Sequence, residues 1–402
     1  MSFRISAVAY LLSLALVLGG SKETDNNTDL NLYAQSAVLM DADTGRILYG
    51  KNENEILANA STTKILTCIL ALELGDMESY VSVSETAAKM PKVHLGMKDG
   101  QFFKLKDLLY SLMLESHNDS AVAIAEHIGG SVEKFAVLMN EKAKNLGCVN
   151  TYFITPNGLD AVAGEKFHST TAVDLSKMMS YCVLQSPKKD EFLEICTKNS
   201  HTFSDYKKTE VGFEKNGRTY GVNNKNTFLS MMEGVLAGKT GFTNKAGYCY
   251  VAALHDDERT FVVSLLACGW PNNKHYKWED TKKLFRYGMD NFVYENIVTD
   301  VQMPVLEVEG GIPYGLKQIP VYVSDNTEPL KMLLSKKDKI EVKVYLPLKV
   351  KAPVIKTQQL GKMEYLLNGE VVKTCKICAK AGVEEHTWFW SFAYIFKKWV
   401  IS

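Results

Sequence analysis

A serine and a lysine stand three residues apart, Ser61 and Lys64, where an apolar segment begins. The segment from Ile65 to Leu72 suits a helix, and residues i and i+3 of a helix lie on one face, so the serine oxygen can meet the lysine amine. A serine hydroxyl becomes an effective nucleophile when a base removes its proton. A lysine can be that base if burial or a neighbouring cation keeps it neutral. The pair therefore predicts nucleophilic catalysis by Ser61.

This spacing is not specific by itself. Other Ser-x-x-Lys stretches start at Ser131, Ser186 and Ser204. The simplest interpretation of any one of them is a serine at a helix start followed by a solvated lysine. Whether Ser61 is a nucleophile therefore depends on matching chemistry elsewhere in the chain.

A second segment with suitable side chains is Ser116-His117-Asn118, which lies in a short break between two segments of helical periodicity. Ser116 could relay a proton there, and Asn118 could hold a substrate amide or orient a lysine. The alternative is that Asn118 or Asp119 simply caps the next helix.

A third segment, Lys239-Thr240-Gly241, precedes two apolar runs, 248–254 and 260–266, whose polar connection is typical of a β-hairpin. The glycine lets a ligand approach the backbone closely. Lys239 and Thr240 could then hold a carboxylate with a charge and a hydroxyl. The alternative is an ordinary turn before a strand.

The three segments occur in the order Ser-x-x-Lys, Ser-x-Asn, Lys-Thr-Gly, a set found in penicillin-binding proteins and serine β-lactamases. Another Ser-x-Asn triplet, at Ser324, follows Lys-Thr-Gly and breaks this order. With the Thr-Pro-Asn-Gly-Leu stretch at 155–159 and the segment 238–248, these motifs make the chain resemble the low-molecular-mass penicillin-binding proteins of the D-alanyl-D-alanine carboxypeptidase type, serine peptidase family S11. His117 stands where relatives often have glycine.

The resemblance implies an α+β fold. The catalytic domain, expected over 32–294, would be β-lactamase/transpeptidase-like, with a mainly antiparallel sheet covered by helices. A small all-β C-terminal domain is expected over 300–375, where short β-type runs alternate with turn signals.

The resemblance also implies an activity. The protein would be a serine-type D-Ala-D-Ala carboxypeptidase that removes the terminal D-alanine from peptidoglycan stem peptides, with a role in cell-wall biogenesis and cell shape. Lys64 would take the proton of Ser61, Ser61 would form the acyl-enzyme, and Ser116 would pass a proton to the leaving D-alanine. β-Lactam antibiotics such as penicillin would acylate Ser61 and leave slowly. No metal or other cofactor is expected.

Binding roles follow from the same resemblance. Asn118 would contact the substrate amide and Lys64. The terminal carboxylate would be bound by Lys239, Thr240 and Lys225, the last at a position where relatives often carry arginine. The oxyanion hole would be formed by the backbone N–H groups of Ser61 and Phe242.

Composition limits the other functions. A chain of 402 residues is long enough for two or more domains, and a hydrophobic content of 46% allows a sizeable core. The formal net charge of +0 gives no basic excess of the kind that nucleic-acid-binding proteins have. The cysteines are scattered, and Cys375 and Cys378 lack the second pair of ligands that a zinc site needs. The cysteines of the chain are expected to be mostly free or buried thiols, with at most one local pair.

The pattern also predicts the elements that must position these residues. A β-hairpin is expected over 34–50, where two apolar runs flank a turn-rich segment. Helices are expected over 105–115, 119–128, 131–146 and 278–292. Residues 199–226 are polar and are expected to form a loop.

Both ends of the chain suggest an exported protein at a membrane surface. Residues 1–21 hold Arg4 and a short apolar run, typical of a secretory signal, with an uncleaved anchor as the alternative. Residues 22–31 are expected to be a flexible lead-in. Residues 386–402 hold tryptophans and lysines that suit an amphipathic helix in a membrane interface, with a helix docked on the β domain as the alternative. The predicted location is the outer face of the cytoplasmic membrane.

Three rival functions stay open. A serine β-lactamase usually carries a deacylating glutamate before Lys-Thr-Gly; no clear Glu-x-x-x-Asn loop occurs over 155–175, although Glu165 lies there. A non-catalytic wall-binding protein is disfavoured because all three motifs are intact. An endopeptidase that cuts cross-links would use the same chemistry.

Overall fold

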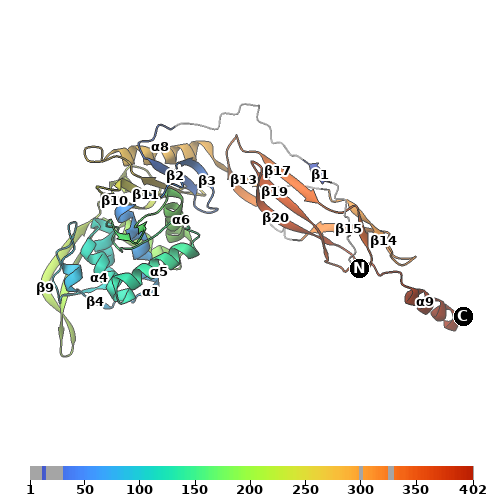
Figure 1. Ribbon diagram of the computed structural model, residues 1–402, viewed down its shortest axis with the longest axis horizontal. Coiled ribbons are helices and arrows are strands. Elements are labelled where there is room, and N and C mark those ends of the chain that lie inside the picture. Colours follow the sequence, from blue (N-terminus) through green and yellow to red (C-terminus); the bar gives the residue numbers. More distant parts are fainter. Residues whose placement is uncertain (1–10, 15–29, 298–301, 325–329, 402) are drawn as a thin grey trace. The chain divides into compact units, whose positions relative to one another are not determined.

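The computed structural model describes residues 11–14, 30–297, 302–324 and 330–401, and it forms two compact units (Figure 1). One unit ends at Asn291, and the other is formed from Phe292 onward together with the short strand β1 (Leu11–Leu14). The predicted export signal and lead-in, 1–31, lie outside the described residues except for β1, which pairs with a strand of the second unit, and residues 30–31.

The first unit is built around a five-stranded antiparallel sheet in which the two ends of the unit meet. Its strands, in spatial order, are β10 (Val235–Thr243), β11 (Gly247–Asp256), β12 (Arg259–Leu266), β2 (Ser36–Asp41) and β3 (Ile47–Lys51). Both predicted hairpins are confirmed, since β2 pairs with β3 and β11 with β12. The strand that carries Lys239 lies at the edge of the sheet, so one side of its backbone is open.

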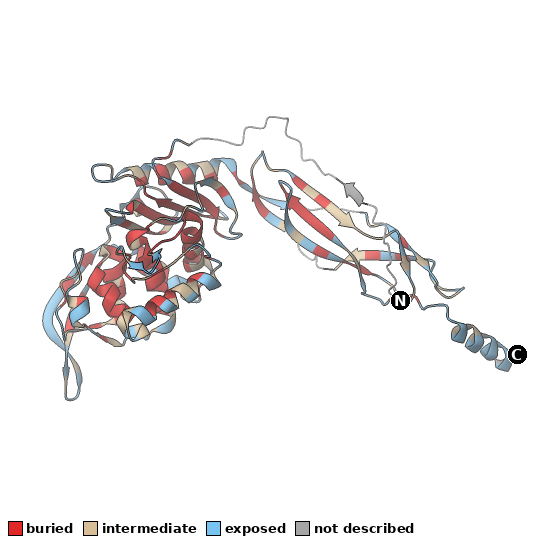
Figure 2. Cartoon of the chain, viewed as in Figure 1, coloured by how far each residue is buried: buried red, intermediate tan, exposed pale blue. Residues whose placement is uncertain are grey.

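Two helices cover opposite faces of this sheet. Phe261 of β12 packs close to Gly288 of α8 (Tyr276–Asn291). Ser264 of the same strand accepts a hydrogen bond of 2.8 Å from Ser176 of α6 (Ala172–Ser180). Because side chains alternate along a strand, these two residues point to opposite faces. The buried residues gather accordingly in the sheet and the helices beside it (Figure 2).

A helical cluster adjoins the sheet and carries two of the three motifs. Its helices and turns are η1 (Ala60–Thr63), α1 (Lys64–Leu74), α2 (Glu85–Ala88), α3 (Leu105–Tyr110), η2 (Ser111–Glu115), α4 (Asn118–Gly129), α5 (Val132–Asn145), η3 (Tyr181–Gln185) and α7 (Lys189–Thr197). The short turn η4 (Thr227–Ser230) lies instead against the sheet and α8, where Phe228 contacts Tyr250 and Trp278. The predicted helices over 105–115, 119–128 and 131–146 are confirmed, with η2 a π-helical turn at the end of the first. Residues 64–72 of α1 are all buried, which makes it the central helix of the cluster.

The prediction of a loop over 199–226 is wrong. This segment forms a long hairpin of β8 (Ser200–Thr209) and β9 (Gly212–Asn223), and it extends a sheet with β4 (Tyr80–Ser82) and β5 (Phe102–Lys104). Most side chains of β9 are exposed, so its sequence lacks the apolar alternation that marks a half-buried strand. A further short hairpin joins β6 (Val162–Ala163) to β7 (Lys166–Phe167).

The second unit is mostly β-structure, as predicted, and it ends in a helix. Its elements are β13 (Val293–Ile297), β14 (Val305–Glu309), β15 (Gln318–Val323), β16 (Leu330–Leu334), β17 (Ile340–Tyr345), β18 (Lys349–Lys351), β19 (Gln359–Leu367), β20 (Glu370–Ala379) and α9 (Trp388–Ile401). Cys375 and Cys378 both lie on β20, at an odd separation that sends their side chains to opposite faces. All eight cysteines of the chain are buried. The predicted α+β fold class is confirmed.

Candidate active site

The predicted nucleophile lies on the tight turn that opens the central helix. Ala60, directly before Ser61, has a left-handed φ of 48°. A side chain at Gly158 would place its Cβ 1.9 Å from the carbonyl oxygen of Ala60, so only glycine allows this approach. Ser61 is thereby presented at the mouth of a cleft while α1 runs into the core.

Lys64 is fully buried beneath Ser61, and its Nζ lies 2.8 Å from Ser61 Oγ. The same Nζ donates to Asn118 Oδ1 at 3.0 Å and to the carbonyl oxygen of Asn157 at 2.7 Å. Burial, with a smaller contribution from the charge of Lys239, holds the pKa of Lys64 well below its usual value. A neutral amine has two hydrogens and one lone pair. Because Asn118 Oδ1 and the Asn157 carbonyl are acceptors, the lone pair is left facing Ser61.

Ser116 lines the same cleft as Ser61 and is paired with the third motif. It has a left-handed φ of 67° where η2 ends. Lys239 Nζ donates to Ser116 Oγ at 2.8 Å and to the carbonyl oxygen of Thr240 at 3.0 Å. Burial lowers the pKa of Lys239 to about 7. Both serines, each within hydrogen-bond distance of a buried lysine, therefore line one cleft.

The loop that carries Ser116 and Asn118 is fixed by its own side chains, which the sequence interpretation did not foresee. The Asn118 backbone N–H donates to the Val93 carbonyl at 2.8 Å, and Asn118 Nδ2 donates to the Pro91 carbonyl at 3.1 Å. The carboxylate of Asp119 accepts from the backbone N–H groups of 95–97, at 2.9 to 3.2 Å. His117 is buried and its Nδ1 lies 2.8 Å from Ser111 Oγ. Asp119 Oδ1 also accepts from the Ser120 backbone N–H at 2.9 Å, so this carboxylate joins the start of α4 to the segment 95–97.

The cleft itself has a volume of about 450 Å³. Of the predicted site residues, all but the buried Lys64 line it: Ser61, Ser116, Asn118, Lys225, Lys239, Thr240 and Phe242. Lys225 is the least constrained, with a side chain 64% exposed and Nζ 3.5 Å from Glu115 Oε1. His168 does not line the cleft.

The sequence interpretation missed two lysines that line the cleft, Lys92 and Lys277. Lys277, on the first turn of α8, is buried and lies over the rings of Tyr248 and Trp278, 4.8 and 4.4 Å from their centroids. Burial lowers its pKa to about 8. The helix was expected to begin at 278, so nothing in the pattern drew attention to the residue just before it. The cleft therefore offers an anion several lysines, and its lining includes a single carboxylate, Glu115.

Among the described residues, no group of three or more histidine, cysteine or acidic side chains is placed to hold a metal ion. Among the helices described, none is long and apolar enough to cross a membrane.

Comparison with known proteins agrees with the motifs. Residues 22–267 match the family model described as D-alanyl-D-alanine carboxypeptidase, and residues 314–385 match that of the penicillin-binding protein 5 C-terminal domain. The chain is 30% identical over 384 residues to D-alanyl-D-alanine carboxypeptidase DacF of Bacillus subtilis, covering 93% of this chain and 92% of the relative.

Solved structures show the same fold. A D-alanyl-D-alanine carboxypeptidase from Mycobacterium tuberculosis is 27% identical with a TM-score of 0.56, covering 68% of this chain and 95% of that one. The carboxypeptidase DacD from Francisella tularensis is 22% identical with a TM-score of 0.67, covering 92% of this chain and 98% of that one.

Proposed function

The chain belongs to the D-alanyl-D-alanine carboxypeptidase family of serine peptidases, and we propose that it cleaves the terminal D-alanine from peptidoglycan stem peptides through an acyl-enzyme on Ser61. One observation carries the proposal. The oxygen of Ser61 lies 2.8 Å from the amine of a fully buried lysine, which points its lone pair at the serine once its two hydrogens are bound elsewhere.

Acylation proceeds in this proposal by proton transfer within the two serine–lysine pairs. Lys64 takes the proton of Ser61, and Ser61 Oγ attacks the carbonyl between the two terminal D-alanines. The backbone N–H groups of Ser61 and Phe242 stabilise the oxyanion, at about 3–4 kcal/mol per donor in comparable enzymes. Ser116 gives its proton to the leaving D-alanine nitrogen and takes one from the charged Lys239, which is hydrogen-bonded to it. Water then hydrolyses the acyl-enzyme.

Substrate binding uses the open edge of β10. An extended peptide can add to such an edge as a further strand, with its backbone groups paired. Asn118 then contacts the substrate amide. The terminal carboxylate is bound by Lys239, Thr240 and Lys225, and Lys277 adds a buried cation to the same wall.

β-Lactams are expected to acylate Ser61 and to leave slowly. A β-lactamase needs a base that activates the deacylating water. Glu165, the one glutamate noted in the region where such a residue would fall, is exposed on the turn between β6 and β7 and does not line the cleft. Glu115 does line it, but its carboxylate is occupied by the Asn223 backbone N–H at 2.9 Å and by Lys225.

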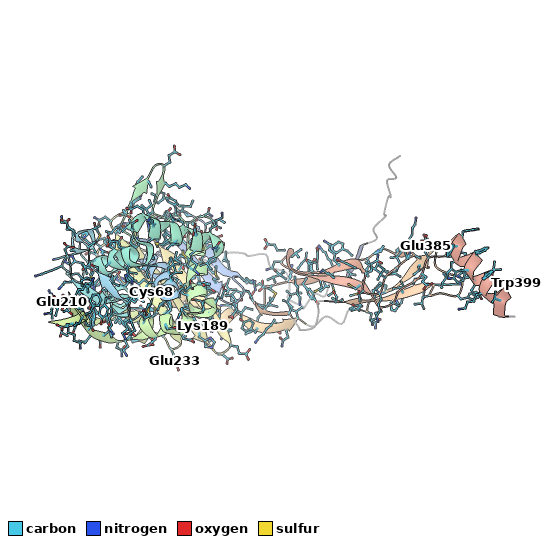
Figure 3. The ribbon with its side chains drawn as sticks, turned by 90° about the horizontal axis from the view of Figure 1, so that it is seen from below. Cys68, Lys189, Glu210, Glu233, Glu385 and Trp399 are labelled. Carbon is cyan, nitrogen blue, oxygen red and sulfur yellow. The ribbon has the colours of Figure 1, made fainter. Side chains whose placement is uncertain are left out.

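The location that we propose is the outer face of the cytoplasmic membrane, where the cell wall is built. The support lies in α9, whose large apolar side chains are mostly exposed; Trp399 lies near its C-terminal end (Figure 3). Tyr394 contacts Tyr314 of the same unit, with ring centroids 5.7 Å apart, so only one edge of the helix is covered. A helix with this exposed surface suits a membrane interface, beside which wall peptides would meet the cleft.

The deciding experiment is labelling with a fluorescent penicillin, with mass spectrometry of the adduct and an assay of D-alanine release from a stem pentapeptide. We expect a stable adduct on Ser61, and neither adduct nor release for Ser61→Ala. Rapid loss of the adduct would indicate a β-lactamase. A folded protein without any adduct would indicate a non-catalytic wall-binding protein.

A further inference from the structure

A buried histidine outside the cleft joins the two segments that hold the reacting pair. His168 is 2% exposed and follows β7. Its Nε2 lies 2.8 Å from Thr63 Oγ1, on the turn that carries Ser61. Its Nδ1 accepts from the backbone N–H groups of Ile154 and Thr155, at 3.0 and 3.3 Å. The ring therefore connects the Ser61 turn to the loop over 154–159.

The contacts fix the proton on this ring. Because Nδ1 accepts hydrogen bonds from backbone N–H groups, it carries no proton, and the neutral imidazole is protonated at Nε2. Burial favours this neutral form by lowering the pKa of His168 to about 3. Nε2–H consequently donates to Thr63 Oγ1, which is left to donate its own proton elsewhere.

The Thr63 hydroxyl passes this constraint to the residue before the nucleophile. Its Oγ1 donates to the carbonyl oxygen of Ala60 at 2.9 Å and also accepts from Asn59 Nδ2 at 2.9 Å. Ala60 has the left-handed φ of 48°, which costs free energy for a residue with a side chain. A hydrogen bond to its carbonyl holds the peptide plane between Ala60 and Ser61, and that plane contains the Ser61 N–H.

The contacts of Nδ1 fix the carbonyl group that accepts a hydrogen bond from Lys64. The loop that His168 holds through Ile154 and Thr155 continues to Asn157, whose carbonyl oxygen accepts from Lys64 Nζ at 2.7 Å. The same carbonyl lies 3.4 Å from Ser61 Oγ. A displacement of this loop would release one hydrogen of Lys64 and change where its lone pair points.

We propose that His168 is a positioning residue for acylation. It acts through Thr63 on the Ser61 N–H and through the 154–159 loop on the proton-accepting geometry of Lys64. This inference rests on the proposed acyl-enzyme mechanism. Misplacing a reacting group by about 1 Å costs up to about 100-fold in rate. Loss of the hydrogen bonds of His168 is therefore expected to slow acylation about 10-fold to 100-fold, with little change in ligand affinity.

Four variants of the full chain separate positioning from general stability. His168→Asn keeps an acceptor near Nδ1 for the loop but cannot reach Thr63. Thr63→Val removes the hydroxyl at nearly constant volume, and Thr63→Ser retains it. Thr260→Val is the matched control, because Thr260 is also a buried threonine, whose Oγ1 lies 3.0 Å from His255 Nδ1 on the hairpin of β11 and β12.

The measurement is the pre-steady-state acylation of each variant by a fluorescent penicillin, resolved into binding constant and acylation rate constant, with thermal unfolding alongside. We expect slow acylation with nearly unchanged binding for His168→Asn and Thr63→Val, no further loss in the double variant, and normal rates for Thr63→Ser and Thr260→Val. If His168→Asn does not fold, Thr63→Val against Thr63→Ser decides the question. Normal acylation by Thr63→Val, or an equal loss in Thr260→Val, overturns the inference. A wild-type protein that is not acylated refutes the proposed function itself.

Discussion

At the scale of single residues, two of the buried lysines at the cleft, Lys64 and Lys239, are proposed to have opposite tasks. Lys64 must be neutral to accept a proton, whereas Lys239 must be charged to attract a carboxylate. Burial lowers the pKa of both. We therefore expect activity over the pH range in which Lys64 has lost its proton and Lys239 still carries its own.

This difference predicts the shape of the pH profile. The value of kcat/KM reports the free enzyme, and it should rise as Lys64 deprotonates and fall above about pH 7, where Lys239 loses its charge. A bound carboxylate stabilises the charged form of Lys239, so kcat itself should fall only at higher pH. In Lys239→Arg the guanidinium stays charged, and the alkaline fall of kcat/KM should disappear. An unchanged alkaline limb in this variant would assign it to another group.

A second prediction concerns the neutrality of Lys64. Arginine cannot lose its proton at ordinary pH, so Lys64→Arg removes the general base while keeping a long basic side chain. We expect the acylation rate to fall by about 10²–10⁴-fold, the usual contribution of such a base. Stopped-flow acylation by a β-lactam measures this. The matched variant is Lys277→Arg, another buried lysine of the cleft, which should retain most of the rate because its proposed task needs charge; an equal loss there would point to side-chain size.

At the scale of elements, the sequence predicted the parts whose side chains alternate between core and solvent. The hairpins of β2–β3 and β11–β12 and the helices α4 and α5 have clear apolar periods. The long hairpin of β8 and β9 was missed because backbone pairing and partly exposed aromatic contacts, such as Tyr80 on Phe213, hold it instead of an apolar face.

The site was predictable to a similar extent. Motif order identified residues that line one cleft, because their chemistry depends on residue type and spacing. Asp119, His168 and Lys277 could not be placed in the same way. Each makes a contact with a residue distant in the sequence: Asp119 with 95–97, His168 with Thr63, and Lys277 with Tyr248. A lone polar residue carries no signal of such a contact.

The contact between β10 and the Ser61 turn gives a prediction at this scale. A Cβ added at Gly241 would lie 2.9 Å from the Ser61 nitrogen and 3.0 Å from the Asn59 carbonyl oxygen, so the strand or the turn must shift. We expect Gly241→Ala to slow acylation by about 10²-fold, as for loss of an oxyanion donor. Gly221→Ala on β9 is the control, because a Cβ there meets nothing within 4 Å. Equal acylation rates for the two variants would show that β10 can shift away from the Ser61 turn without slowing acylation.

At the scale of the whole molecule, the chain consists of two units with separate cores. All cleft residues belong to the first unit. The solved Mycobacterium tuberculosis carboxypeptidase, 95% of which is covered by 68% of this chain, indicates that such a unit can exist by itself.

A protein of residues 26–291 is therefore expected to fold and to be acylated by penicillin at the rate of the full chain. Circular dichroism and the acylation rate constant check this. A folded but inactive fragment would show that the β unit supports the cleft.

The end of the chain gives a last prediction, about attachment. α9 has 14 residues, hence a length of about 21 Å, which is short of the ~30 Å hydrocarbon core of a bilayer. It nevertheless exposes Trp388 and Trp399, at 80% and 78%. A helix of this kind gains free energy by lying in the interface, with Lys398 near the headgroups. Sedimentation with lipid vesicles should recover the full chain in the pellet and leave a chain without 386–402 in the supernatant.

The contribution of the tryptophans can be separated from that of exposed apolar surface in general. Replacing Trp388 and Trp399 by serine should release most of the protein from vesicles, because each loses a large apolar ring from the interface. Val211→Ser is the control, since Val211 is 92% exposed at the tip of the hairpin of β8 and β9. If both changes release the protein, the vesicles bind exposed apolar side chains wherever these lie in the chain. If the tryptophan variant still sediments with the vesicles, the two tryptophans do not attach the protein to the membrane. The role of α9 would then be its contact between Tyr394 and Tyr314 within the unit, and another part of the chain would have to provide the attachment.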